Sequence, residues 1–272
     1  MAESVIVASG KGGVGKSTFA AGLGAVLAHR GRRVVVVDLD IGLRSQDALL
    51  GLSDRVVYDL MDAQSGDCTL DQAVIPCASP ASLCLLPAAQ FARAKALHPS
   101  KLREIINQLK ESFDYVLLDC PAGIERGLRN ALNAGADRAV LVTTPDDVSL
   151  RDAERAFQVM EAKGLPRPFL VVNRLDDRLI RRGEMISAAA AAQLLDLPLL
   201  GEIPDDPAVG RSLLRRRLFT DFVCEARSAM LRVASRFEGA AVPFPDYGRR
   251  RVPLFSRALS ARMREVVPGD GV

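Results

Sequence analysis

The sequence predicts an α/β fold, a three-layer, mostly parallel, twisted sheet flanked by helices. Three observations lead to this fold class. Short, continuous apolar runs alternate with helix-like segments at least five times, which is typical of parallel strands buried on both faces. A glycine-rich turn joins the first apolar run to the first helical segment, and polar residues follow several later runs. Because ligands bind at the carboxyl edge of such sheets, we expect a functional site there.

The composition is that of a water-soluble globular chain. Of its 272 residues, 49% are hydrophobic and 25% are charged. No run approaches the roughly 18 continuous apolar residues that cross a membrane, and the first residues enter a strand without a signal-peptide pattern. We therefore expect a cytoplasmic protein. No linker divides the chain before about residue 240, so we expect one domain over residues 1–240.

The cysteine content and the net charge argue against several classes of function. The chain has five cysteines, two histidines and a net charge of +3. The cysteines form no C-x-x-C pair, which argues against a disulfide framework, a thiolate metal site and an iron–sulfur carrier. The net charge is too small to indicate nucleic acid by itself, although arginines gather toward the end of the chain.

The glycine-rich turn has the form G-x-x-x-x-G-K-[ST] and lies between a strand and a helix, as a phosphate-binding loop must. Its glycines let backbone N–H groups approach phosphate oxygens, and the helix adds its positive dipole end. Lys16 is expected to reach the β- and γ-phosphates, and the Ser17 hydroxyl to hold Mg²⁺. The nucleotide-binding candidates here are Gly10, Lys11, Gly12, Gly13, Val14, Gly15, Lys16, Ser17 and Thr18.

After a helix over residues 19–30, the next buried strand, residues 33–37, runs into Asp38 and Asp40. A carboxylate at this place can orient the attacking water or take its proton, and another can hold Mg²⁺ through water. If the strand continued, the two side chains would point to opposite sides, so at most one would face the nucleotide directly. The alternative is a solvated turn that caps the following segment.

The middle of the chain predicts a short helix over residues 69–74, a strand over 83–86 and a surface helix over 100–112. The strand at residues 113–118 then ends in Asp119, which is expected to hold Mg²⁺ or its water shell.

Three further strands are expected at residues 139–143, 169–172 and 199–203. Ser149, with Asp152 three residues later, fits the start of a helix. The last two strands end in Asn173 and in Pro204-Asp205, which we expect to contact the adenine from the same sheet edge.

The last segments predict a helix over residues 222–237, a proline-bearing connector over 241–253 and a basic amphipathic helix over 254–267. At 100° per residue the apolar side chains of this last helix gather on one face. Such a helix can lie in an anionic membrane surface, and two copies on a dimer would bind more tightly than one. Docking on the protein core is the alternative. The membrane candidates are Leu254, Phe255, Leu259, Met263 and Val266.

These stretches resemble the MinD/ParA class of deviant Walker A P-loop ATPases, and most closely its MinD family, the septum-site-determining ATPases. The resemblance runs to about residue 210 and returns at the tail. The stretches that carry it are residues 10–18, 38–44, 55–59, 119–125, 149–152, 182–185 and 203–206.

The resemblance implies a Mg²⁺-dependent ATPase that dimerises with ATP bound, Lys11 reaching the partner's nucleotide across the dimer. It implies that Asp40 governs hydrolysis, that Asp119 acts on the switch loop, and that Asp152 lies on the surface read by the division inhibitor MinC and the activator MinE. The tail would place the protein on the inner face of the cell membrane, and ATP hydrolysis to ADP would release it. The arginines and alanines of this tail depart from the family's lysine- and phenylalanine-rich ending.

Two alternatives of the same class stay open at this point. A flagellar-placement ATPase also carries a membrane helix. A DNA-segregation ATPase of the ParA type is suggested by Arg211 and by residues 215–217, but the aromatic residues that would stack on bases are missing. Nucleic acid is therefore not the expected partner.

Overall fold

The computed structural model describes residues 2–90, 97–124 and 126–245, and within these ranges it contains one eight-stranded sheet. The strands are β1 (Glu3–Ala8), β2 (Val34–Asp38), β3 (Ile75–Pro76), β4 (Leu83–Leu86), β5 (Tyr115–Asp119), β6 (Arg138–Thr143), β7 (Phe169–Leu175) and β8 (Leu199–Pro204). Their order is β3-β4-β2-β5-β1-β6-β7-β8, and every neighbouring pair is parallel except β3 with β4. The mostly parallel sheet that the sequence predicts is confirmed.

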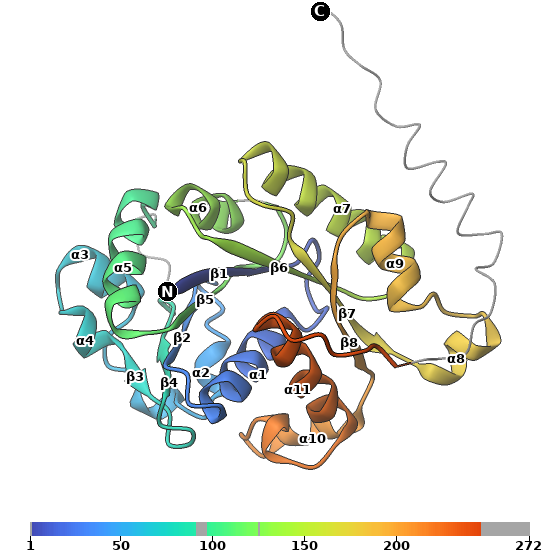
Figure 1. Cartoon of the computed structure of the whole chain (residues 1–272). Coiled ribbons are helices and arrows are strands. Elements are labelled where there is room, and N and C mark those ends of the chain that lie inside the picture. The colour runs from blue at the N-terminus through green and yellow to red at the C-terminus, as the bar shows by residue number, and fades with distance from the viewer. Residues whose placement is uncertain (1, 91–96, 125, 246–272) are drawn as a thin grey trace, which may run out of the picture.

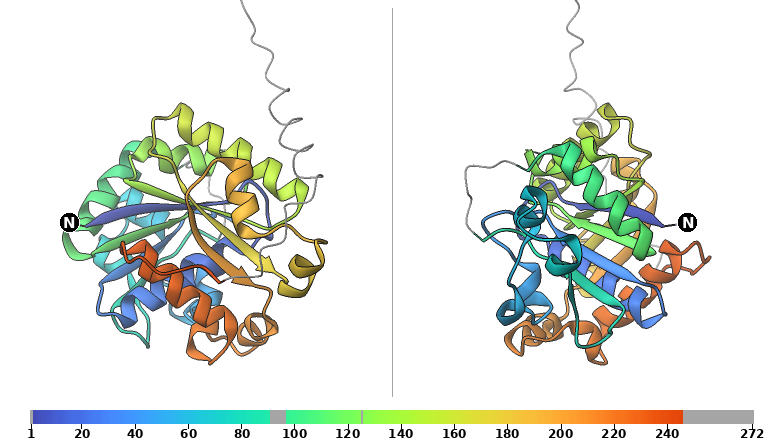
Figure 2. Two further views of the ribbon diagram at one scale, coloured as in Figure 1. Left: turned by 45° about the vertical axis from the view of Figure 1, so that its right-hand side comes forward. Right: turned by 90° about the vertical axis from the view of Figure 1, so that its left-hand side faces the viewer.

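The α-helices are α1 (Lys16–His29), α2 (Gln46–Leu49), α3 (Leu60–Ser65), α4 (Leu70–Ala73), α5 (Pro99–Ser112), α6 (Arg126–Ala134), α7 (Asp147–Ala162), α8 (Asp177–Arg182), α9 (Ala188–Leu195), α10 (Pro207–Leu214) and α11 (Glu225–Phe237). Two 3-10 turns, η1 (Ser53–Arg55) and η2 (Phe219–Asp221), join them. Helices α1 and α11 cover one face of the sheet, and α5, α6, α7 and α9 cover the other (Figures 1 and 2).

The two faces of β1 show how the sequence produces these three layers. Val5 and Val7 pack with α1 and α11, while Ile6 and Ala8 pack with the helices of the opposite layer. All four side chains are fully buried. Because neighbouring side chains of a strand point to opposite faces, only a continuous apolar run can fill both cores. The ladder thereby holds the carboxyl end of β1, where the phosphate loop begins, at a fixed place in the sheet.

Most of the predicted elements are found within a few residues of their expected bounds. Helix α5 buries the four residues that its helical spacing predicts, Leu102, Ile105, Ile106 and Leu109. Two expectations about helix starts were wrong. The side chain of Asp146, and not Ser149, caps α7, because Asp146 accepts a hydrogen bond from the Ser149 backbone N–H at 3.0 Å. Helix α11 begins at Glu225 and not at residue 222, because Cys224 occupies its N-cap after the 3-10 turn η2.

Candidate functional site

The phosphate loop joins β1 to α1, and close contacts leave no room for a side chain at two of its glycines, Gly10 and Gly15. Gly15 occupies the N-cap of α1 with φ +92°, and a Cβ there would lie 2.3 Å from the Asn173 Nδ2 atom. The expectation that β7 ends at Asn173 was wrong, because this strand continues to Leu175. From within β7, Asn173 donates a hydrogen bond to the Val14 carbonyl at 2.8 Å. Glycine is therefore required at position 15, and Asn173 supports the loop. An additional adenine contact by Asn173 stays a prediction.

A second close approach fixes the loop against α7. A Cβ on Gly10 would lie 2.0 Å from the Asp152 carbonyl oxygen, so only a glycine fits beneath this helix. The Asp152 side chain is partly exposed and lies 3.5 Å from the Arg155 guanidinium. Asp152, which is expected to lie on a partner-binding surface, thus belongs to a turn of α7 whose backbone contacts the phosphate loop.

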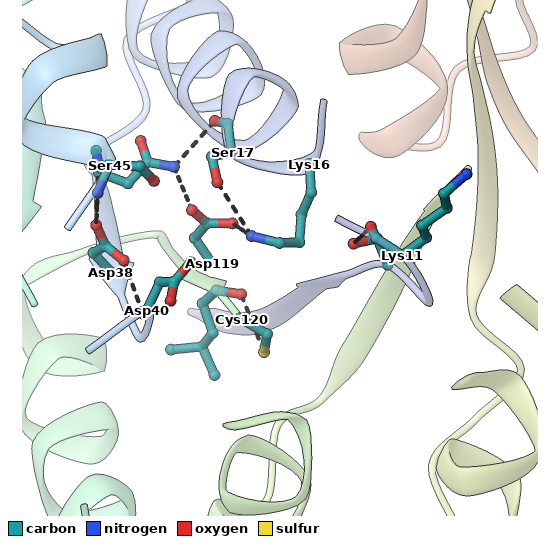
Figure 3. Close-up of polar contacts among 11 residues, drawn as sticks. Lys11, Lys16, Ser17, Asp38, Asp40, Ser45, Asp119 and Cys120 are labelled. Atoms are coloured by element: carbon teal, nitrogen blue, oxygen red, sulfur yellow. Dashed lines mark hydrogen bonds and ion pairs between the residues drawn. The ribbon is translucent and has the colours of Figure 1, made fainter. Parts of the chain in front are cut away.

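Lys16 lies inside the site and is paired with Asp119. Its side chain is 7% exposed, and Nζ donates to Asp119 Oδ1 at 2.5 Å and to Ser17 Oγ at 3.1 Å. Asp119 ends β5, beside β1, and is fully buried. Figure 3 shows the three side chains converging at the start of α1. The structure therefore brings together the lysine, hydroxyl and carboxylate that were expected to serve the phosphates and Mg²⁺.

Asp38 and Asp40 occupy different environments. Strand β2 ends at Asp38, so the alternation expected for a longer strand does not apply. Asp38 is fully buried and accepts backbone hydrogen bonds from Asp40, Ser45 and Gln46 at 2.9 to 3.0 Å. Burial and the neighbouring Asp119 raise the pKa of Asp38 to about 6, although the backbone donors act in the opposite direction. Asp38 thus anchors the turn that carries Asp40; its contact with Mg²⁺ through water stays a prediction.

Asp40 is partly exposed and lies near Asp38 and Asp119 (Figure 3). Burial raises the pKa of its carboxyl group, and the nearby Lys16 ammonium partly offsets this effect. A carboxylate that is accessible and close to a cation can orient a water molecule or accept its proton. The role of Asp40 in hydrolysis stays a prediction.

Lys11 points away from this cluster (Figure 3). Its side chain is 44% exposed, and Nζ lies 3.9 Å from Asp146 Oδ1. An ion pair of this length and exposure contributes little to stability. Lys11 is therefore free to exchange Asp146 for another anion at little cost.

Pro204 is the last residue of β8, and Asp205 follows it at the same sheet edge. The Asp205 backbone N–H already donates to the Leu175 carbonyl at 2.9 Å, and proline has no N–H. Any backbone contact of this pair with adenine would therefore have to use a carbonyl oxygen as acceptor.

Sequence reasoning missed one residue of the site, Gln46. Its side chain is fully buried, and Nε2 donates to Asp119 Oδ2 at 2.7 Å and to the Ser17 carbonyl at 3.0 Å. The only signal in the sequence is a glutamine in the stretch that follows Asp40, and its spacing indicates no particular chemistry.

The donor set fits a nucleotide with Mg²⁺. Ser17, Asp38 and Asp119 offer oxygen atoms, the ligands that Mg²⁺ prefers, and Gln46 Oε1 is buried without a hydrogen-bond partner among the described residues. Within the described ranges, no group of three histidine, cysteine, aspartate or glutamate residues could hold a metal ion alone. Mg²⁺ in nucleotide sites usually keeps several water ligands and is shared with substrate phosphates.

The predicted membrane residues of 254–267 lie outside the described residues, as does most of the connector over 241–253. Across the described part of the chain, no helix is both long and apolar enough to pass through a bilayer. All five cysteines are free, and burial raises the pKa of Cys120 to about 12, in keeping with a small apolar core residue.

Comparison with known proteins identifies the family. A family model described as "ParA: NUBPL iron-transfer P-loop NTPase" matches residues 1–230. The septum site-determining protein MinD of Synechocystis sp. is 40% identical over 94% of this chain and 97% of its own length. A putative MinD of Guillardia theta is 44% identical over 99% of both chains. The alignment with the Guillardia theta protein therefore includes most of the tail.

Solved structures agree. A chain in the MinC:MinD cell division protein complex of Aquifex aeolicus superposes with a TM-score of 0.83 at 34% identity, covering 91% of this chain and 100% of its own. MinD of Pyrococcus horikoshii, solved with Mg-ADP, gives 0.78 at 30% identity, covering 88% and 97%. A ParA family ATPase of Chlorobium tepidum, at 22% identity, shares the fold alone. The chain belongs to the MinD family of septum site-determining proteins within the ParA-type P-loop NTPases, and is a division-site ATPase.

Proposed function

We propose that this chain is a membrane-cycling ATPase that positions the division septum. With ATP bound it forms a homodimer, attaches to the inner face of the cell membrane through its tail, and recruits a MinC-like division inhibitor. A MinE-like activator then promotes hydrolysis, and the ADP form leaves the membrane. The Mg-ADP complex of the Pyrococcus horikoshii protein and the MinC:MinD complex of Aquifex aeolicus support this proposal.

The observation that carries the proposal is the buried pair of Lys16 and Asp119 beside Ser17. In the nucleotide-bound protein Lys16 exchanges Asp119 for phosphate oxygens. Mg²⁺, when bound, neutralises phosphate charge and would be held by the Ser17 hydroxyl and, through water, by Asp119 and Asp38. Asp40, which is partly exposed, orients the attacking water.

Lys11 couples nucleotide binding to dimer formation. Among the described residues its exposed ammonium has one weak partner, Asp146 at 3.9 Å. We infer that it contacts the phosphates bound to the partner protomer, so that dimer formation and triphosphate binding depend on each other. The two tails of such a dimer bind the membrane together, whereas one short amphipathic helix binds only weakly.

Sedimentation with anionic liposomes tests the membrane cycle. The full chain should pellet with Mg²⁺ and ATP and remain in solution with ADP, and a chain without residues 254–272 should not pellet with either nucleotide. Leu259→Asp should weaken pelleting more than Ser260→Asp, which adds the same charge without removing an apolar side chain. Equal pelleting with ATP and ADP, or pelleting that survives the deletion, would show that the mechanism is wrong.

Division-inhibitor binding is tested separately. Asp152→Ala should lower ATP-dependent co-sedimentation of a MinC-like protein with the liposome-bound ATPase, and Glu161→Ala, at the other end of α7, should not. If both variants bound the inhibitor like the unaltered chain, the assignment of Asp152 would fail, while the membrane cycle itself would stand.

A further inference from the structure

Gln46 occupies an unusual position for a glutamine. It is the first residue of the four-residue helix α2, yet its side chain is fully buried between β5 and the start of α1. Burying an uncharged amide is unfavourable unless its polar atoms find partners. The contacts of Gln46 therefore indicate why a polar side chain is present there.

Its amide nitrogen bridges two parts of the nucleotide site. Nε2 donates to Asp119 Oδ2 at 2.7 Å and to the Ser17 carbonyl at 3.0 Å. Both partners are acceptors, so the amide cannot turn its oxygen toward them without losing both hydrogen bonds. The orientation of Gln46 is thus fixed by the residues that it contacts.

Asp119 is held from two sides by donors of different kinds. Lys16 Nζ donates a hydrogen bond to Asp119 Oδ1 at 2.5 Å, and Gln46 Nε2 donates one to Asp119 Oδ2. When Lys16 turns to the phosphates, Gln46 remains as the donor that orients this carboxylate. The backbone N–H of Gln46 also donates to Asp38 at 3.0 Å, which joins the turn after Asp40 to the same network.

Gln46 Oε1 is the part of this side chain that has no partner. It is buried and accepts no hydrogen bond within the described residues. A leucine of similar size would fill the same space without this unpaired oxygen. Packing alone therefore does not explain the choice of glutamine.

We propose that Gln46 is a positioning residue that orients Asp119 toward the hydration shell of Mg²⁺. The proposal rests on the proposed function, since it requires the Mg²⁺-nucleotide site. Residues around a metal site that orient its ligands typically change metal affinity by roughly 10- to 100-fold when they are replaced. The loop and Lys16 bind phosphates independently of this contact, so nucleotide affinity without Mg²⁺ depends little on Gln46.

Binding of the fluorescent probe mant-ADP to the full chain tests the proposal. Its affinity is measured with Mg²⁺ and with EDTA, and the ratio gives the gain due to Mg²⁺. Gln46→Leu should reduce this gain by about 10-fold or more, with the affinity in EDTA unchanged. The matched control Gln108→Leu, on an exposed position of α5, should leave both values unchanged.

A second variant keeps the test decisive if Gln46→Leu does not fold. Gln46→Asn keeps the amide group but shortens the side chain by one methylene, so the amide no longer reaches Asp119 Oδ2 from the same backbone position. The gain due to Mg²⁺ should then fall as it does in Gln46→Leu, with the affinity in EDTA unchanged. Gln108→Asn is the control.

The outcomes are distinct. If Gln46→Leu keeps the full gain, or if it weakens binding equally with Mg²⁺ and with EDTA, Gln46 is a packing residue and the inference is wrong. If Gln46→Asn keeps the same gain as Gln108→Asn, the contact with Asp119 does not orient it. If the unaltered chain fails to bind mant-ADP at all, the proposed function fails first, and this inference with it.

Discussion

Asp38 and Asp119 are direct neighbours in the ladder between β2 and β5, and both are fully buried. Two adjacent carboxylates in a protein interior repel each other unless each has its own donors. Asp119 has a cation and an amide, Lys16 and Gln46, whereas Asp38 has three backbone N–H groups. The two carboxylates therefore differ in how their charge is stabilised. Asp119 contacts the ammonium group of Lys16 in the phosphate loop, whereas Asp38 contacts only uncharged N–H groups among the described residues.

The first prediction concerns the titration of Asp38. Its pKa is raised to about 6, chiefly by burial and next by Asp119. Since an unfolded aspartate releases its proton near pH 4, this group lowers the free energy of unfolding as pH rises from about 4 to about 6, and has no further effect above that. Carboxyl carbon NMR should show a midpoint for Asp38 near pH 6. A midpoint below 4 would contradict this.

The same spectra contain an internal comparison. The pKa of Asp114 is lowered by hydrogen bonds from the backbone N–H and side chain of Arg33. Asp114 should therefore titrate below its ordinary value, on the opposite side from Asp38. If the two residues titrated with the same midpoint, burial would not be raising the pKa of Asp38 above that of Asp114.

Removing Lys16 should destabilise the fold as well as the site. Lys16→Ala leaves Asp119 buried without its cation, which typically costs about 3–5 kcal/mol. Urea unfolding measures the loss, and mant-ADP binding should disappear in the same variant. Lys101→Ala, which breaks an exposed pair with Glu104, should cost less than about 1 kcal/mol. Similar losses for the two variants would argue against a buried, energetically important pair.

Removing Lys11 should leave stability unchanged but prevent dimer formation. Lys11→Ala removes only a weak, exposed contact at 3.9 Å, so urea unfolding of the monomer should be unchanged within about 0.5 kcal/mol. Light scattering with Mg²⁺ and ATP should nevertheless show a monomer in place of the dimer. Lys163→Ala, just beyond α7 and exposed, is the control that should dimerise. A normal dimer of the Lys11 variant would exclude its role across the interface.

Gly10 should tolerate no side chain, whereas Gly12 should tolerate a methyl group in the folded state. A Cβ at Gly10 would lie 2.0 Å from the Asp152 carbonyl oxygen, and one at Gly12 would lie 3.8 Å from its nearest neighbour, Ala122 Cβ. Gly10→Ala must push α7 from the loop and should cost about 1–3 kcal/mol in urea unfolding. Gly12→Ala should remain close to the unaltered chain. Equal stability of the two variants would mean that the loop and α7 separate easily.

Features that depend on local sequence could be predicted, and those that depend on distant contacts could not. The buried face of α5 follows from helical spacing, and the phosphate loop from its motif. The partners of Gln46 are a strand end 73 residues away and a carbonyl 29 residues away, and nothing near position 46 indicates either. The prediction that Ser149 caps α7 was wrong for a local reason. Asp146 and Ser149 are both good N-cap residues, and the helix begins after the earlier one.

The order of the strands has a consequence for how the protein is made. Although β1 and β2 follow each other in the chain, β5 lies between them in the sheet and pairs with both. A nascent chain that has emerged from the ribosome only as far as β2 carries the whole phosphate loop and Asp38, but has no strand to hold them side by side. The site can assemble only after Asp119 has been synthesised, so a truncated product that ends before β5 has the motif without the means to use it.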